Sequence, residues 1–336
     1  MINQGFTFAV APMMDWTDRY CRVFHRALSK RALLYTEMVV SDAVIHGNLD
    51  YLIGFDDVEH PIALQIGGSD PVKLAKASKI GEARGYDEIN INIGCPSDRV
   101  QSGSFGACLM AEPELVADCF KAMQAAVDIP VTVKCRLGID DQDIEKTLPN
   151  FIETTARAGC THFIIHARKA WLQGLSPKDN RTVPPLNYEI VRRMKRQFPE
   201  LEIVLNGGLT DLDLALPESK DLDGVMFGRA AYHNPWLLHE VDSKVFGDAA
   251  RDITREDVAR EMIIAARDME GRGLRTRALT RHMNGLFHQT PGARLWRRSL
   301  SEGAASGAVG SEVIARALGA MLERRAKAKD NAKGAA

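Results

Sequence analysis

The sequence predicts a (β/α)8 barrel followed by a small all-α domain. Three observations support this fold class: eight short apolar runs in the first 230 residues, helical patterns between them, and no further strand pattern after Gly247. The expected strands are Phe6–Pro12, Leu33–Met38, Pro61–Gly67, Glu88–Gly94, Pro130–Arg136, His162–Ala167, Glu202–Gly208 and Gly224–Arg229. Because barrels of this kind carry their chemistry at the carboxyl ends of the strands, the residues that end these runs are the first candidates for function.

Local signals justify the elements in order along the chain. The third strand is followed by Ser69-Asp70-Pro71, which offers a helix cap and a proline for the first turn of a helix. The fifth strand is rich in β-branched residues and opens with proline, as a buried parallel strand can. The sixth strand is followed by a loop from Lys169 to Pro185, which is long for a βα connection and therefore a candidate for function.

After Gly247 the pattern becomes helical. Thr254 and Asp257 form a sequence like a capping box, and apolar residues then recur at helical spacing. Ser311 is expected to cap the last helix. We therefore expect a barrel domain over residues 1–247, a helical domain over 248–323, and a disordered tail over 324–336, where alanine and lysine predominate.

The overall composition excludes several classes of protein. Of the 336 residues, 45% are hydrophobic and 26% charged, as in ordinary globular proteins, and no apolar run reaches the roughly 18 residues of a membrane helix. The N-terminus shows no secretory signal. The six cysteines contain no C-x-x-C pair, so we expect neither a metal site nor a disulfide scaffold, and a reducing cytoplasm fits.

Charge is unevenly spread along the chain. From Arg251 to the C-terminus there are 17 Lys and Arg against 10 Asp and Glu, whereas the first 250 residues hold 26 against 34. No acidic residue lies between Glu270 and Glu302. The basic residues of that interval are Arg272, Arg275, Arg277, Arg281, His282, His288, Arg294, Arg297 and Arg298. A solvated helix face is the ordinary explanation, but such faces mix signs, so contact with nucleic-acid phosphates is favoured.

The expected strand ends carry groups suited to a phosphorylated ring cofactor. Asn206-Gly207-Gly208 and Gly228-Arg229 end strands seven and eight, where barrels frequently bind phosphate through backbone N–H groups. Turn glycines are the alternative. Lys134, His166 and Gln65 end strands five, six and three and offer donors to a heteroaromatic ring such as a flavin. A surface lysine and a structural histidine are the alternatives for the first two.

The fourth strand points to proton chemistry. Asn90 and Asn92 alternate with isoleucines, so the two amides share one face of the strand. Cys95 follows them at the expected barrel mouth. A lone cysteine is more often a small buried apolar residue, but a thiol among amides is mostly protonated at neutral pH and can act as a general acid.

Several motifs together resemble the tRNA-dihydrouridine synthase family. They are Ala11-Pro-Met-Met-Asp-Trp-Thr-Asp-Arg19, Gln65-Ile-Gly-Gly-Ser-Asp-Pro71, Asn90-Ile-Asn-Ile-Gly-Cys-Pro-Ser-Asp-Arg-Val100, Phe105-Gly-Ala-Cys-Leu-Met110, His166-Ala-Arg-Lys-Ala-Trp171, Asn206-Gly-Gly208 and Gly228-Arg-Ala-Ala-Tyr232. Gly174-Leu-Ser-Pro-Lys178 and Arg294-Leu-Trp-Arg-Arg298 resemble the A-type subfamily. The resemblance runs from about Phe8 to Leu318. One departure is Met14, which stands where leucine is frequent.

The resemblance implies an FMN-binding barrel with a helical tRNA-binding domain, acting on uridines 20 and 20a of the tRNA D loop with NADPH as reductant. FMN would supply hydride to uracil C6, and Cys95 would protonate C5. The residues implied for FMN are Pro12, Met13, Met14, Gln65, Lys134, His166, Asn206, Gly207, Gly208, Gly228 and Arg229. Those implied for the uracil are Asn92 and Arg136, and those for tRNA are Lys178, Arg181, Arg294, Arg297 and Arg298.

Two alternatives remain at this point. The first is an FMN barrel that acts on a free pyrimidine, which would have no use for the arginine-rich interval or for a second domain. The second is an RNA-binding barrel that has lost the flavin, against which the set of Lys134, His166 and Cys95 argues. If the protein acts on tRNA, we expect it to bind this substrate as a monomer.

Overall fold

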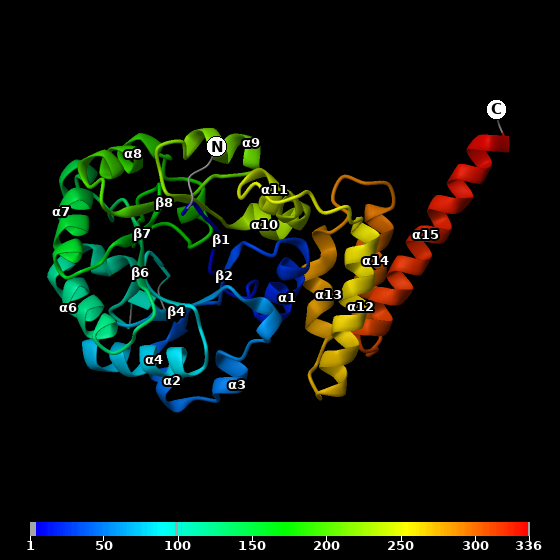
Figure 1. Ribbon diagram of the computed structural model, residues 1–336, viewed down its shortest axis with the longest axis horizontal. Helices are drawn as coiled ribbons and strands as arrows, with labels where there is room; N and C mark the ends of the chain where they lie inside the picture. Colours follow the sequence, from blue (N-terminus) through cyan, green and yellow to red (C-terminus); the bar gives the residue numbers. More distant parts are fainter. Residues whose placement is uncertain (1–4, 98–99, 102, 335–336) are drawn as a thin grey trace. The chain divides into compact units, whose positions relative to one another are not determined.

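The computed structural model describes residues 5–97, 100–101 and 103–334, and the side chains up to residue 328. The motif residues Asp98 and Arg99 lie outside this description. The chain divides into two compact units, one comprising Met1–Thr17 and Ala32–Gly228 and the other Asp18–Arg31 and Arg229–Ala336. Figure 1 labels the helices and most of the strands of the two units.

The first unit is a closed barrel of parallel strands, as the sequence predicts. Its strands are β1 (Thr7–Val10), β2 (Leu33–Tyr35), β3 (Val39–Val40), β4 (Ile62–Gly67), β5 (Glu88–Ile93), β6 (Val131–Arg136), β7 (His162–His166), β8 (Glu202–Asn206) and β9 (Gly224–Phe227). Pairing of β2 with both β1 and β4 closes the ring, and the short β3 is an addition on β4 that the sequence did not reveal. The expected runs therefore correspond to the eight strands of the ring.

Helices connect the strands of the barrel. They are α2 (Ser41–His46), α3 (Leu49–Leu52), α4 (Pro71–Ala83), α6 (Pro113–Gln124), α7 (Ile144–Arg157), α8 (Tyr188–Gln197) and α9 (Leu212–Glu218), with 3-10 turns η1 (Asp57–Glu59), η2 (Gly106–Ala111) and η3 (Asp179–Arg181). Asp70 caps α4 by accepting from the backbone N–H groups of Val72 and Lys73, which confirms the predicted cap.

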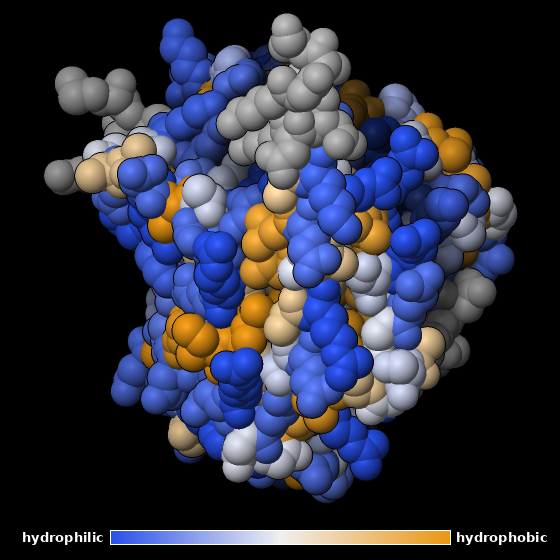
Figure 2. Space-filling model, turned by 90° about the vertical axis from the view of Figure 1, so that its right-hand side faces the viewer, coloured by the Kyte–Doolittle hydropathy of each residue, from blue (hydrophilic) through white to orange (hydrophobic). Residues whose placement is uncertain are grey.

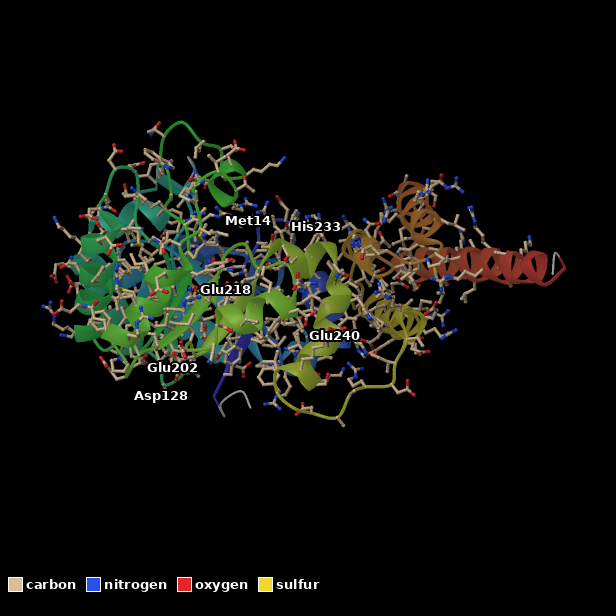
Figure 3. The ribbon with its side chains drawn as sticks, turned by 90° about the horizontal axis from the view of Figure 1, so that it is seen from above. Met14, Asp128, Glu202, Glu218, His233 and Glu240 are labelled. Atoms are coloured by element: carbon tan, nitrogen blue, oxygen red, sulfur yellow. The ribbon has the colours of Figure 1, made fainter. Side chains whose placement is uncertain are left out.

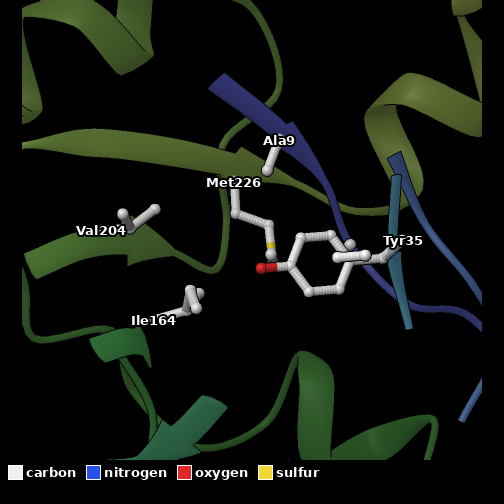
Figure 4. Close-up of a cluster of buried hydrophobic side chains, with 7 residues drawn as sticks. Ala9, Tyr35, Ile164, Val204 and Met226 are labelled. Atoms are coloured by element: carbon white, nitrogen blue, oxygen red, sulfur yellow. The ribbon is translucent and has the colours of Figure 1, made fainter. Parts of the chain in front are cut away.

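Strand alternation decides which side chains fill the barrel. A buried apolar cluster contains Ala9, Ala11, Tyr35, Ala63, Ile164, Val204 and Met226, which come from six of the strands or directly follow them. Figure 4 shows Tyr35 and Met226 reaching toward one another inside the ring. The two ends of the barrel are visible in Figure 3, where Met14, after β1, lies at one end and Asp128 and Glu202, before and at the start of their strands, lie at the other. Polar side chains occupy the interior on the carboxyl side of this apolar cluster.

The second unit is helical. Its elements are α1 (Arg19–Leu28), α10 (Arg229–His233), η4 (Pro235–Glu240), α11 (Val241–Lys244), α12 (Arg255–Gly271), α13 (Arg277–His282), η5 (Met283–Gly285), α14 (Ala293–Ala305) and α15 (Gly310–Gly334). The predicted capping box is present, since Thr254 and Asp257 bond reciprocally at the start of α12. No helix in the described part of the chain has the length and apolarity needed to span a bilayer.

The bounds of this unit differ from the predicted helical domain, because α1 packs on α12, α13 and η4 and is grouped with them. Asp18 caps α1, accepting from Cys21 N, and also pairs with Arg281 at 2.7 Å and His282 at 3.0 Å. Such long-range contacts have no local sequence signal. The catalytic and tRNA-binding roles expected of the two parts stay predictions.

The last helix differs from the expectations at two places. Ser311 lies inside α15, and its hydroxyl donates to Glu270 at 2.6 Å instead of accepting from its own helix. The segment from Arg324, expected as a disordered tail, continues α15 to Gly334. Alanine, lysine and arginine are strong helix formers, so this composition extends a helix that is already nucleated.

Candidate active site

A file of hydrogen-bonded amides lines the barrel interior near the carboxyl ends of β4 and β5. Asn92 Nδ2 donates to Gln65 Oε1 at 2.8 Å, and Gln65 Nε2 donates to Asn90 Oδ1 at 2.8 Å. All three side chains are buried, and Asn90 and Asn92 face inward between outward isoleucines, as the alternation predicted. The amides are therefore fixed in orientation before any ligand arrives.

Cys95 lies on the loop directly after these amides. Its backbone N–H donates to Asn92 Oδ1 at 2.9 Å, and its carbonyl accepts from Ala107 N at 2.9 Å. The close approach of η2 requires Gly106, which has φ +78° and where a Cβ would lie 2.6 Å from the Cys95 carbonyl oxygen. The half-buried Cys95 Sγ lies 3.4 Å from Ser97 Oγ. This thiol is thus held at the barrel mouth by backbone contacts on both sides.

Lys134 provides a half-buried cation in the same interior. Its Nζ donates to Asn206 Oδ1 at 3.0 Å, and Asn206 Nδ2 donates to the Met226 carbonyl at 2.7 Å. Burial, together with the nearby charge of Arg136, lowers the pKa of Lys134 to about 8. The register pairs Lys134 with Asn92, so the cation and the amide file come from neighbouring positions. A lysine in this setting is not the surface lysine that was its alternative.

Glycines directly follow β8 and β9. Gly207 and Gly208 have φ values of +108° and +72°, and a Cβ on Gly207 would lie 3.2 Å from His166 Cε1. A Cβ on Gly228 would lie 3.9 Å from Met13 Sδ and 4.0 Å from Ala11 Cβ, which is ordinary van der Waals contact. Arg229, expected to act with Gly228, begins α10 and belongs to the helical unit.

The guanidinium of Arg136 is engaged by the protein backbone and is not open to a substrate. Its guanidinium donates to the carbonyls of Gly94 at 2.9 Å, Lys169 at 3.0 Å and Asn180 at 2.9 Å, and the residue is only 5% exposed. Burial lowers the pKa of Arg136 to about 10. These donors tie the loop after β5 to the loop after β7, a structural role that the sequence did not indicate.

The loop from Lys169 to Pro185 is organised around Asn180, a residue that the sequence did not single out. Asn180 is fully buried, accepts from Trp171 N at 2.7 Å and donates to the Trp171 carbonyl at 2.8 Å. Lys178 and Arg181 are exposed on either side of it. An asparagine between charged residues carries no sequence signal for such burial, because its partners depend on how the loop closes.

The segment after β1 is turned by Asp15, a non-glycine residue with φ 64°. The backbone N–H of Asp15 donates to the Glu37 carboxylate, and Met13 N donates to Thr17 Oγ1 at 2.9 Å. Met14 is 57% exposed, whereas Pro12 and Met13 are half-buried. The leucine-to-methionine departure therefore falls on a side chain that packs little against the protein.

Arginines on α14 expose charge on the helical unit. Arg294, Arg297 and Arg298 are exposed, while Trp296 and Leu300 on the same helix are buried. Figure 2 shows one face of this unit, where hydrophilic side chains flank an apolar strip. This separation leaves the three arginines available to an external partner.

The expectation that the arginine-rich interval lacks acidic partners is wrong for three of its members. Arg272 pairs with Asp268 at 3.0 Å, Arg281 with Asp18 at 2.7 Å, and Arg298 with Glu302 at 3.7 Å. Two of these partners lie just outside the interval and one lies on a distant segment, so a count within the interval misses them. The arginine-rich interval is therefore basic, but some of its arginines form ion pairs with carboxylates outside the interval.

Comparison with known proteins agrees with the motif resemblance. The family model "Dihydrouridine synthase (Dus)" matches residues 9–321. The chain is 55% identical over 312 residues to a tRNA-dihydrouridine(20/20a) synthase of Shewanella oneidensis, covering 93% of each chain. It is 54% identical over 319 residues to a protein of the same name from Escherichia coli K12, covering 95% of this chain and 92% of that one.

A solved structure supports the barrel fold alone. The old yellow enzyme homologue of Zymomonas mobilis superposes with a TM-score of 0.52 at 12% identity, covering 71% of this chain and 88% of that one. Together with the family match, the expected resemblance is confirmed. The chain belongs to the dihydrouridine synthase family of oxidoreductases.

Proposed function

We propose that this protein reduces uridine to 5,6-dihydrouridine at positions 20 and 20a of the tRNA D loop, using FMN and NADPH. The observation that carries the proposal is the Cys95 thiol, which is held at the barrel mouth by the inward amide of Asn92. The half-buried cation of Lys134 neighbours that amide in register. The names of the relatives from Shewanella oneidensis and Escherichia coli support the substrate and its positions.

The described residues fit FMN. The left-handed Gly207 and Gly208, together with Gly228, suit a phosphate approached by backbone N–H groups. Lys134 suits negative charge on a ring, and Gln65 offers a fixed amide. The full set proposed to hold FMN is Pro12, Met13, Met14, Gln65, Lys134, His166, Asn206, Gly207, Gly208, Gly228 and Arg229.

When bound, FMN would supply the hydride for uracil C6, with NADPH as the reductant. Cys95 donates the proton from Sγ to C5, so that hydride and proton together saturate the C5–C6 bond. Asn92 orients the uracil. Arg136 contributes a fixed positive charge near the developing negative charge on the ring. Because its guanidinium already holds three carbonyls, we propose that it acts mainly through this field.

The substrate is reached by unstacking a loop base, which costs less in RNA loops than in a duplex. We propose that Lys178, Arg181, Arg294, Arg297 and Arg298 contact tRNA phosphates, since all five side chains are exposed cations. One protein molecule then acts on one tRNA as a monomer, in the cytoplasm where tRNA is modified.

The test of the reaction is dihydrouridine mapping. Purified protein is incubated with unmodified tRNA, FMN and NADPH, and dihydrouridine is located by position. Product at 20 and 20a is expected. Product elsewhere in tRNA would keep the chemistry and reject the positions. Product from free uracil or orotate but not from tRNA would reject the tRNA substrate.

The test of the proton donor uses two cysteines. Cys95→Ala is expected to retain FMN and tRNA binding and to lose turnover by about 10²-fold or more, because general acid catalysis contributes on that scale. Cys108→Ala is the matched control, since Cys108 is also half-buried but its Sγ donates to the Phe105 carbonyl at 3.1 Å. Unchanged turnover in Cys95→Ala would remove this residue from the mechanism.

A further inference from the structure

The amide file at the barrel mouth continues toward the start of β5, to the half-buried carboxyl group of Glu88. Asn90 Nδ2 donates to Thr132 Oγ1 at 2.8 Å, and Thr132 Oγ1 donates to Glu88 Oε1 at 2.6 Å. Together with the bonds among Asn92, Gln65 and Asn90, an unbroken series runs from the Cys95 backbone to Glu88 at the start of β5. Glu88 has no part in the proposed chemistry, and its partners are the hydroxyls of Thr132 and Tyr35.

Every bond in this series points the same way. At the mouth, the backbone N–H groups of Gly94 and Cys95 can only donate, so they fix the carbonyl oxygen of Asn92 upward. Its NH2 then points down to Gln65, and each following amide repeats that orientation. Asn90 donates to the Thr132 oxygen. The single O–H of Thr132 is therefore left to donate to an acceptor nearer the start of β5.

Glu88 Oε1 is that acceptor. The same oxygen also accepts from the Tyr35 hydroxyl on β2. Burial raises the pKa of Glu88 to about 7, and the nearby carboxylates Glu202 and Asp87 act in the same direction. A protonated carboxyl group still accepts at its carbonyl oxygen, so the series does not depend on the charge of Glu88.

We propose that Glu88 is a positioning residue: as the last acceptor of the series, it anchors the Asn90 and Gln65 amides in the orientation that the backbone N–H groups of Gly94 and Cys95 set at the mouth, and so steadies Asn92 and the backbone of Cys95. Without an acceptor at Glu88, the Thr132 hydroxyl turns elsewhere and the amides above it keep only their upper anchor, because Asn and Gln are held in one orientation only by their partners. The inference rests on the proposed function insofar as these amides and Cys95 meet FMN and uracil.

The test compares two variants that break the series with two that keep it. Glu88→Leu removes the acceptor, and Thr132→Val removes the link while Glu88 stays in place. Glu88→Gln keeps an acceptor oxygen and is expected to restore what Glu88→Leu loses. Tyr35→Phe is the matched control, because it removes the other donor to the same oxygen and leaves the series intact.

The first readout is alkylation of Cys95 in protein without added FMN, in a Cys108→Ala background. We expect alkylation to be about two- to tenfold faster in Glu88→Leu and Thr132→Val, the range that the loss of one net hydrogen bond allows. Glu88→Gln and Tyr35→Phe are expected to stay close to the parent rate. Thermal unfolding of all variants separates a folding defect from this effect, and if Glu88→Leu does not fold, Thr132→Val decides.

The second readout is the visible spectrum and Kd of bound FMN. We expect an altered spectrum and about two- to tenfold weaker binding in the two breaking variants. Equal changes in Tyr35→Phe, or no change in alkylation and FMN binding in Thr132→Val, would overturn the inference. A parent protein that binds no FMN but shows the expected alkylation pattern would reject the proposed function and leave the role of Glu88 standing.

Discussion

Arg136 offers a quantitative test of how the barrel mouth is held together. Its guanidinium joins three backbone carbonyls, those of Gly94, Lys169 and Asn180, which belong to two separate loops. Arg136→Met keeps the apolar stem and removes all three hydrogen bonds. Each of these carbonyls, one in a buried and two in partly buried contacts, costs about 1–3 kcal/mol when it loses its donor, so at about 2 kcal/mol apiece the three together cost about 6 kcal/mol.

Part of this cost is offset because the variant no longer buries a charge. Burial lowers the pKa of Arg136 from 12.5 to about 10, which corresponds to about 3 kcal/mol against the charged form. The net loss in the free energy of unfolding is therefore about 3 kcal/mol. For a domain of this size, that loss lowers Tm by about 6–12 °C.

The assay is calorimetric unfolding combined with limited proteolysis. Arg136→Met is expected to lower Tm and to speed cleavage within residues 169–185. Arg192→Met is the control, because Arg192 also makes three hydrogen bonds, but with the exposed Glu189 and with Glu218 near the surface, where such pairs contribute about 1 kcal/mol or less. An equal fall in Tm for both variants, or unchanged cleavage of the loop in Arg136→Met, would refute the reasoning.

Three further predictions follow from single contacts. Gly208→Ala is expected to cost about 1–3 kcal/mol in unfolding free energy, because φ is +72° and the new Cβ would lie 2.8 Å from the Tyr188 hydroxyl; calorimetry showing no loss would contradict this. Burial raises the pKa of Glu88 from 4.5 to about 7, so the folded state binds an extra proton between these pH values, and the free energy of unfolding falls as pH rises through this interval. Glu88→Gln should remove about 3 kcal/mol of that pH dependence. Parallel curves of Tm against pH for the parent and the variant would contradict this prediction. Arg298→Ala should leave Tm unchanged, since the ion pair of Arg298 with Glu302 is exposed and 3.7 Å long. It should reduce the slope of log K for tRNA binding against log salt concentration by about one unit. An unchanged slope would place this arginine away from the phosphates.

The barrel could be predicted from the sequence because its signals are local. Runs of apolar residues ended by polar groups located the eight strands of the ring, and period-two alternation in β5 identified the inward face of Asn90 and Asn92. The cap of α4 by Asp70 and the capping box at Thr254 were equally legible, since both depend on residues within one turn of the helix.

The errors have a common physical cause. Ser311 was expected to cap its own helix but donates to Glu270, which lies 41 residues away. Arg281 finds Asp18 from the other end of the chain. Local spacing cannot report such partners, because they meet only when distant segments pack.

By itself, the sequence determined the strands, the inward residues and, through its motifs, the family. Only the tertiary structure decided which of those residues contact one another. Barrel closure sets the register between strands, and the register brings Gln65 to Asn90 and Lys134 to Asn206, 25 and 72 residues apart. Barrel closure also brings Arg136 to backbone carbonyls and Glu88 to the Thr132 end of the amide series. These assignments depend on distances across the closed ring, which a pattern of period two does not contain.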